Sequence, residues 1–273
     1  MYKLIACDLD ETLLDDHHQI CIKNKEMIKK ATELGVKFVP ATGRGFMAVQ
    51  NILKDLDLYQ KENEYTLAFN GAALVENKNN KMILFEGLTF AKAKELFEFG
   101  LDKDVCIQVY TDTVVYMYNL NNDERQRYHK AKTEYVELIE PTIDFLKDQL
   151  IAKVIYQNTD IPYLNNIQEE MKSLTDGEIS ISYSSNRYME LNRLGVDKGN
   201  TMLKLAEILG IKPEETIAVG DNYNDMPMLL VAGLSVAANN AVDGVKEVCD
   251  YVCENDNNQG VVAELIEKFI LNV

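Results

Sequence analysis

Leu4-Ile5-Ala6-Cys7-Asp8-Leu9-Asp10-Glu11-Thr12 is the stretch of this chain that decides its fold. The apolar run from Leu4 to Cys7 has the length of a buried strand, and two carboxylates, Asp8 and Asp10, follow it directly. Side chains alternate along an extended chain, so acids two residues apart are directed to the same side. Such pairs are also common in ordinary turns, so other residues of the chain must show whether this pair belongs to a functional site.

Strands and helices alternate after this stretch, which predicts parallel strands joined by helical crossovers. Gly35 is expected to end the first helix. The predicted elements are a helix over 22–34, a strand over 36–40, a helix over 46–56, a strand over 66–70, and a hairpin with its turn near 79–80.

The pattern changes after residue 84, where short strands with hairpin-length links mix with helices and predict an inserted antiparallel α+β module. Hinges are expected near 84–89 and 184–188. The module is expected to hold helices at 90–101, 122–130 and 163–174 and strands at 106–110, 114–118, 152–156 and 179–183.

The alternation of strands and helices resumes from Met189, which predicts that the chain re-enters the first domain. The expected elements are helix 198–209, strand 216–219, a helix through 230, strand 234–237, a helix from 242, strand 251–253 and helix 261–270.

Composition excludes several classes of protein. The net charge of −16 over 273 residues argues against general affinity for nucleic acid or an anionic membrane, because both need a basic face. No run approaches membrane-spanning length, and the first residues do not read as a signal peptide. Five cysteines without a C-x-x-C pair fit neither a disulfide framework nor a zinc site, so we expect a cytoplasmic protein. The sequence carries no signal for oligomeric state.

Polar residues follow several predicted strands at the edge where ligands bind in open parallel sheets. Thr42 follows the second strand, Asp221 and Asp225 follow the strand ending at Val219, and Lys198 opens a helix in the same half. Phosphoryl transfer needs such a set. Carboxylates hold Mg²⁺, one aspartate attacks phosphorus, another carboxylate moves protons, and a hydroxyl and an ammonium hold phosphate oxygens.

With these motifs in order, the chain resembles the haloacid dehalogenase-like (HAD) hydrolases, specifically the Cof-type sugar-phosphatase-like subfamily. The matching motifs are Asp8–Thr12, Ala41–Arg44, Gly195–Gly199 and Gly220–Met226. The resemblance implies that Asp8 is the nucleophile and that Asp10 is the acid/base. It also implies that Thr42, Gly43 and Lys198 bind phosphate. The metal ligands that it implies are the Asp8 and Asp221 side chains and the Asp10 backbone carbonyl, with Asn224 and Asp225 in support.

The resemblance also implies an α/β fold with a Rossmann-like parallel core over 1–84 and 188–273 and an α+β cap domain over 85–187. The implied enzyme is a magnesium-dependent phosphatase acting on a small phosphorylated metabolite, such as a sugar phosphate, through an aspartyl-phosphate. Arg44 is expected to be a surface residue outside the catalytic set.

The same residues are compatible with three other functions. A phosphomutase or phosphotransferase uses the same core motifs, and only release of free phosphate without an acceptor separates it from a phosphatase. A phosphate-binding protein without turnover can lose Asp10, which this chain keeps. A dinucleotide-binding protein is suggested by the G-x-G-x-x-A pattern at Gly43–Ala48, although that pattern belongs in the first crossover unit rather than the second.

Overall fold

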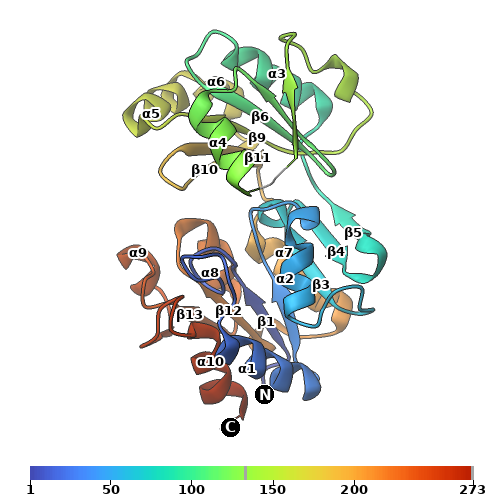
Figure 1. Ribbon diagram of the computed structural model, residues 1–273, viewed down its shortest axis with the longest axis vertical. Helices are drawn as coiled ribbons and strands as arrows, with labels where there is room; N and C mark the ends of the chain where they lie inside the picture. Colours follow the sequence, from blue (N-terminus) through green and yellow to red (C-terminus); the bar gives the residue numbers. More distant parts are fainter. Residues whose placement is uncertain (132–133, 272–273) are drawn as a thin grey trace. The chain divides into compact units, whose positions relative to one another are not determined.

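A computed structural model describes residues 1–131 and 134–271, and they form two compact units (Figure 1). Unit 1 comprises Met1–Leu84 and Asp197–Val273, and unit 2 comprises Phe85–Val196. The predicted α/β class with a parallel core and an insertion is therefore confirmed. Within the described ranges, no helix combines the length and the apolar character that a membrane span requires.

A five-stranded parallel sheet is the centre of unit 1. Its order is β14-β13-β12-β1-β2, so the first strand lies between strands from the two halves of the chain. The sheet therefore reverses its winding at β1, which is where ligands bind in such folds. The strands are β1 (Leu4–Cys7), β2 (Lys37–Pro40), β12 (Thr216–Gly220), β13 (Leu234–Ala237) and β14 (Tyr251–Val252).

Helices cover both faces of this sheet, because the buried strands carry apolar side chains on both sides. Ile5 and Cys7 belong to the core beneath α1 and α10, whereas Leu4 and Ala6 belong to the core beneath α7 and α8. The helical segments of unit 1 are α1 (Ile22–Glu33), η1 (Phe46–Val49), α2 (Gln50–Asp55), α7 (Lys198–Leu209), η5 (Pro213–Glu215), η6 (Tyr223–Asp225), α8 (Met226–Val231), α9 (Asp243–Lys246), α10 (Val261–Ile266) and the π-helical η7 (Glu267–Leu271).

The predicted hairpin forms part of a small three-stranded sheet in the order β3-β4-β5. Its elements are β3 (Tyr65–Ala68), η2 (Phe69–Gly71), β4 (Ala73–Glu76), η3 (Lys78–Asn80) and β5 (Lys81–Phe85). The sequence predicts that this strand reaches Asn70, but β3 ends at Ala68 because Phe69 and Asn70 take left-handed φ values of 53° and 55°. A parallel bridge from Ala41 to Leu67 joins this sheet to the end of β2.

Unit 2 contains a six-stranded sheet in the order β10-β11-β9-β6-β7-β8. The pairings are antiparallel, as predicted for this α+β module, except for β7 with β8, which is parallel. The elements are α3 (Phe90–Gly100), β6 (Cys106–Thr111), β7 (Val115–Tyr118), α4 (Asn122–Ala131), β8 (Tyr135–Leu138), η4 (Asp144–Leu146), β9 (Ile151–Gln157), α5 (Ile161–Glu170), α6 (Lys172–Thr175), β10 (Ile179–Ser184) and β11 (Tyr188–Arg193).

The boundary between the units differs from the sequence expectation at its second crossing. The sequence placed the return to the core at residue 188, whereas the compact units divide between Val196 and Asp197. The physical reason is β11, which pairs with β10 on one side and β9 on the other and so belongs to the sheet of unit 2. Residues 185–187 are consequently the turn between β10 and β11, so a β-hairpin stands where a hinge was expected.

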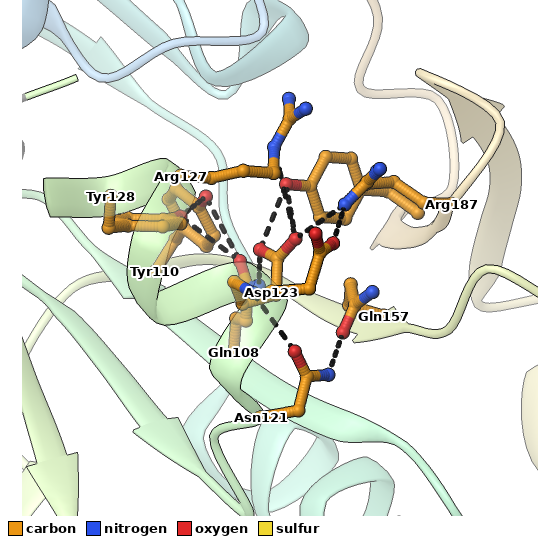
Figure 2. A network of polar contacts seen from close by, with 10 residues as sticks. Gln108, Tyr110, Asn121, Asp123, Arg127, Tyr128, Gln157 and Arg187 are labelled. Atoms are coloured by element: carbon orange, nitrogen blue, oxygen red, sulfur yellow. Dashed lines mark hydrogen bonds and ion pairs between the residues drawn. The ribbon is translucent and has the colours of Figure 1, made fainter. Parts of the chain in front are cut away.

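A polar network, shown in Figure 2, joins α4 to this sheet. The Glu124 side chain has no exposed surface, and it accepts hydrogen bonds from Gln108, Tyr188 and Arg187. Arg187 also pairs with Asp123. Because α4 is strongly polar, the buried carboxylate and its donors hold this helix in place where apolar packing usually would.

Candidate active site

Three buried aspartates converge beyond the carboxyl ends of the central strands. Asp8 follows β1 and Asp221 follows β12, and these two strands are hydrogen-bonded neighbours. Their pairing extends past the end of β1, because the Asp8 N–H donates to the Val219 carbonyl at 3.0 Å. Asp225 lies in η6, one turn further. Each residue offers a carboxylate oxygen, and these oxygens lie within 4.8 Å of one another. Like charges this close are stabilised by a nearby cation or by a proton on one of the carboxylates.

Lys198 supplies one such cation. Its side chain is fully buried, and its Nζ donates to Asp8 Oδ1 at 2.5 Å and to Asp225 Oδ1 at 2.6 Å. Burial opposes the charged ammonium, but the carboxylates of Asp225 and Asp8 outweigh burial and raise the pKa of Lys198. Lys198 is therefore a permanent positive charge between the nucleophile candidate and the acidic loop.

Close backbone packing places Lys198 at this point. Asp197 caps α7 by accepting the Asn200 N–H at 2.8 Å, so the helix begins at Lys198. A Cβ on Gly71 would come within 2.2 Å of the Asp197 carbonyl oxygen, and a Cβ on Gly199 within 2.3 Å of the Pro227 carbonyl oxygen. Glycine at both positions lets the start of α7 approach the β3–β4 loop and the start of α8.

The charge balance and donor chemistry of the cluster fit a divalent cation. Three carboxylates face one ammonium, which leaves two negative charges in excess when all three acids are ionised. Burial, and then the Asp225 charge, raise the pKa of Asp8 well above its usual value. The same two causes raise the pKa of Asp221 to about 7. Oxygen donors with excess negative charge are the ligands that Mg²⁺ prefers.

The hydrogen bonds of Asp225 indicate that it supports the loop that carries Asp221, a candidate metal ligand. Asp225 Oδ1 accepts from Lys198, while its Oδ2 accepts the backbone N–H groups of Asp221 and Asn222 at 3.0 and 3.2 Å. Asp225 therefore holds the loop that presents Asp221. Asn224 lies in the same short turn and is half-buried.

Thr12 is a functional candidate that the sequence interpretation missed. Its side chain is buried, and its Oγ1 donates to Asp221 Oδ1 at 2.6 Å, which joins the first motif to the fourth. This bond orients the Asp221 carboxylate. The available signal was a hydroxyl two residues after the acid pair, but nothing in the sequence indicates which distant carboxylate it contacts.

Thr12→Val is expected to raise the Mg²⁺ concentration for half-maximal activity by about ten- to hundredfold, because partners that orient metal ligands typically contribute this much. The substitution preserves side-chain shape and removes only the donor. Magnesium titration of the phosphatase activity that the motifs imply measures the effect, with Thr12→Ser as the matched control that keeps the hydroxyl. Equal half-activating concentrations for Thr12→Val and wild type would contradict this role.

The loop after β2 lies beside the Asp8 loop, since Cys7 and Pro40 are register partners. Thr42 is almost fully buried, its N–H donates to the Leu67 carbonyl at 2.9 Å, and its carbonyl accepts the Asn70 N–H at 2.9 Å. Its Oγ1 accepts the Arg44 N–H at 3.1 Å, so the hydroxyl proton remains to be donated elsewhere. A Cβ on Gly43 would come within 3.1 Å of the Asn70 side chain. The loop after β2 is thus held in place by hydrogen bonds of Thr42 and by close packing of Gly43 against Asn70.

Asp10 lies apart from the buried carboxylates. Its side chain is 44% exposed. The Arg44 guanidinium hydrogen-bonds both of its carboxylate oxygens, with Nε donating to Oδ2 at 2.8 Å and Nη2 donating to Oδ1. Arg44 was expected to be a surface residue outside the catalytic set. Its side chain is 32% exposed, and it contacts the predicted acid/base. Its position directly after Thr42-Gly43 was the signal in the sequence.

Comparison with known proteins defines the class. A family model for haloacid dehalogenase-like hydrolases matches residues 5–265. YxeH, a putative phosphatase of Bacillus subtilis (strain 168), is 30% identical over 275 residues that cover 99% of each chain. The 5-amino-6-(5-phospho-D-ribitylamino)uracil phosphatase YcsE of the same organism is 30% identical over 269 residues, which cover 98% of this chain and 96% of YcsE.

A solved haloacid dehalogenase-like hydrolase from Bacteroides thetaiotaomicron has a TM-score of 0.84 and 29% identity, and the match covers 98% of this chain and 99% of that one. The chain belongs to the haloacid dehalogenase-like hydrolases. Within them it is a phosphoric monoester hydrolase of the Cof-type branch, which confirms the resemblance seen in its motifs.

Proposed function

We propose that the protein is a magnesium-dependent phosphatase that hydrolyses a small phosphorylated metabolite, such as a sugar phosphate, through an aspartyl-phosphate on Asp8. The observation that carries the proposal is the position of Asp8 directly after β1, where it pairs with Lys198 and lies close to the Asp221 carboxylate. A buried carboxylate with one fixed cation and excess negative charge suits a phosphate group that arrives with a divalent ion.

The Asp8 and Asp221 side chains and the Asp10 carbonyl would hold Mg²⁺, with Asn224 and Asp225 supporting the loop. When bound, the ion supplies positive charge to the phosphate oxygens. Thr42 donates its hydroxyl, Gly43 its backbone N–H and Lys198 its ammonium to the same group, so the negative charge of the transition state is matched on several sides.

The reaction has two steps. In the first, an Asp8 oxygen attacks phosphorus, the bond to the leaving oxygen breaks, and Asp10 gives that oxygen a proton. In the second, Asp10 takes a proton from a water molecule, whose oxygen attacks the phosphorus of the aspartyl-phosphate and releases inorganic phosphate and Asp8.

Unit 2 is proposed to act as the cap domain that recognises the rest of the substrate. One face of its sheet carries buried polar groups, including the ion pair of Lys153 Nζ with Glu190 Oε2 at 2.5 Å. On the same face, Asn192 is 4% exposed, and its Oδ1 lacks a hydrogen-bond partner within the described ranges. Mixed donors and acceptors suit a hydroxyl-bearing molecule, and the name of YcsE, a phosphatase of a phosphoribitylamino compound, supports that choice.

The test is release of inorganic phosphate from a panel of phosphorylated metabolites with magnesium and with EDTA. Activity is expected only with the metal. Because the pKa of Asp221 is raised to about 7 and a ligand must lose its proton, the half-activating Mg²⁺ concentration is expected to rise up to about tenfold per unit as pH falls below 7. Release without any acceptor alcohol would exclude a strict phosphomutase, and full activity in EDTA would contradict the metal assignment.

A further inference from the structure

Resting on the proposed function, we infer that Arg44 is a positioning residue that acts through Asp10: its guanidinium fork holds the proton-carrying carboxylate in the orientation that serves the leaving group. Arg44 would thereby couple the loop after β2, which binds phosphate, to the loop after β1, which moves the proton. The inference concerns only unit 1, where both side chains lie.

The backbone of Arg44 is held rigidly. Its N–H donates to Thr42 Oγ1 at 3.1 Å, and its carbonyl accepts the Phe69 N–H at 2.9 Å. The neighbouring Gly45 is equally confined, since a Cβ there would come within 2.9 Å of the Phe69 ring. A fixed backbone at this point restricts where the guanidinium can reach, so the Arg44 side chain is a suitable anchor for another group.

Asp10 needs such an anchor more than the other acids of the site. Asp8, Asp221 and Asp225 are buried and bonded within their cluster, whereas the Asp10 side chain is nearly half exposed. Apart from Arg44, the ion-pair partner of Asp10 within the described ranges is His18, whose Nδ1 is 3.7 Å from Oδ1 and whose side chain is 73% exposed. Two parallel bonds from a planar guanidinium fix the plane of a carboxylate, which a single bond does not.

A role exerted through the proton carrier has a specific kinetic signature. An alkyl leaving group needs a proton as its bond to phosphorus breaks, whereas p-nitrophenolate leaves readily without one. Arg44→Gln is expected to lower kcat/KM for an alkyl phosphate by about ten- to hundredfold and that for p-nitrophenyl phosphate by no more than about threefold. Arg44→Lys keeps the charge but loses the fork, so it is expected to behave like Arg44→Gln.

The experiment compares both substrates in wild type, Arg44→Gln, Arg44→Lys, Asp10→Asn and the double variant Asp10→Asn/Arg44→Gln. If Arg44 acts through Asp10, the double variant loses no more than Asp10→Asn alone. Arg125→Gln is the matched control, because Arg125 also makes a two-bond pair, through Nη1 and Nη2, with Glu137 on the surface of unit 2, with both bonds at 2.7 Å. Its ratio of the two kcat/KM values is expected to equal that of wild type.

Each outcome decides between the alternatives. Equal losses on both substrates in the Arg44 variants, or losses that add to those of Asp10→Asn, would overturn the positioning role while leaving the phosphatase intact. Added guanidinium is expected to restore part of the alkyl-phosphate activity of Arg44→Ala, and a folded variant without such rescue would also count against the inference. Wild-type protein that releases no phosphate from either substrate would overturn the proposed function and this inference with it.

Discussion

Asp8→Asn is expected to lower phosphate release by at least about 10³-fold, since an amide cannot accept a phosphoryl group and loss of a nucleophile typically costs this much or more. The side chain keeps its volume, so the loss is chemical. Initial rates with p-nitrophenyl phosphate measure it. Asp148→Asn, at an exposed position of unit 2, is the control and should be as active as wild type. Near-normal turnover by Asp8→Asn would refute the covalent mechanism.

Lys198→Met is expected to have the largest effect on stability, a loss of about 3–5 kcal/mol in the free energy of unfolding, because it leaves two buried carboxylates without their shared cation. Denaturant unfolding without metal measures this change. Saturating Mg²⁺ is expected to restore part of it, since the ion binds only the folded protein.

The control for that measurement is Lys25→Met, which removes an exposed pair with Asp55 at 2.8 Å and should change the free energy by no more than about 1 kcal/mol. If Lys198→Met were destabilised no more than Lys25→Met, Lys198 would not carry the electrostatic role assigned to it.

The sequence predicted the elements that position the site because their signals are local. Helix α7 begins at Lys198 and ends at Leu209 as predicted, since Asp197 caps its start and Gly210, with a φ of 67°, ends it. The strands β1 and β13 also match their predicted ranges. Their buried apolar runs are followed by polar loops, and the ends of parallel strands must meet at one edge.

Two strands escaped prediction for reasons of packing. β8 is a short edge strand with half-exposed side chains, so its residues show no apolar alternation. β11 lies where the sequence predicts the return to the core, and Glu190 and Asn192 interrupt its apolar residues. Those polar side chains are nevertheless buried, and long-range pairing with β9 and β10 decides where the strand belongs.

The side-chain contacts within the site could not be predicted from local sequence patterns, because they join residues that are far apart in the chain. Thr12 touches Asp221 across 209 positions of sequence, and Arg44 reaches Asp10 across 34. The G-x-G-x-x-A pattern at Gly43–Ala48 shows the opposite limitation. Gly43 and Gly45 lie against the side chains of Asn70 and Phe69, so close packing accounts for both glycines without a dinucleotide.

The most direct test of the proposed mechanism is to trap the covalent intermediate. Protein mixed with substrate and Mg²⁺, quenched in acid within a single turnover and digested, is expected to carry one phosphoryl group on the peptide that contains Asp8. With p-nitrophenyl phosphate, whose leaving group needs no proton, Asp10→Asn should accumulate more of it, because the base that activates water is gone. Hydrolysis that proceeds at the normal rate with no phosphoryl group on Asp8, or with the group on another residue, would contradict the mechanism.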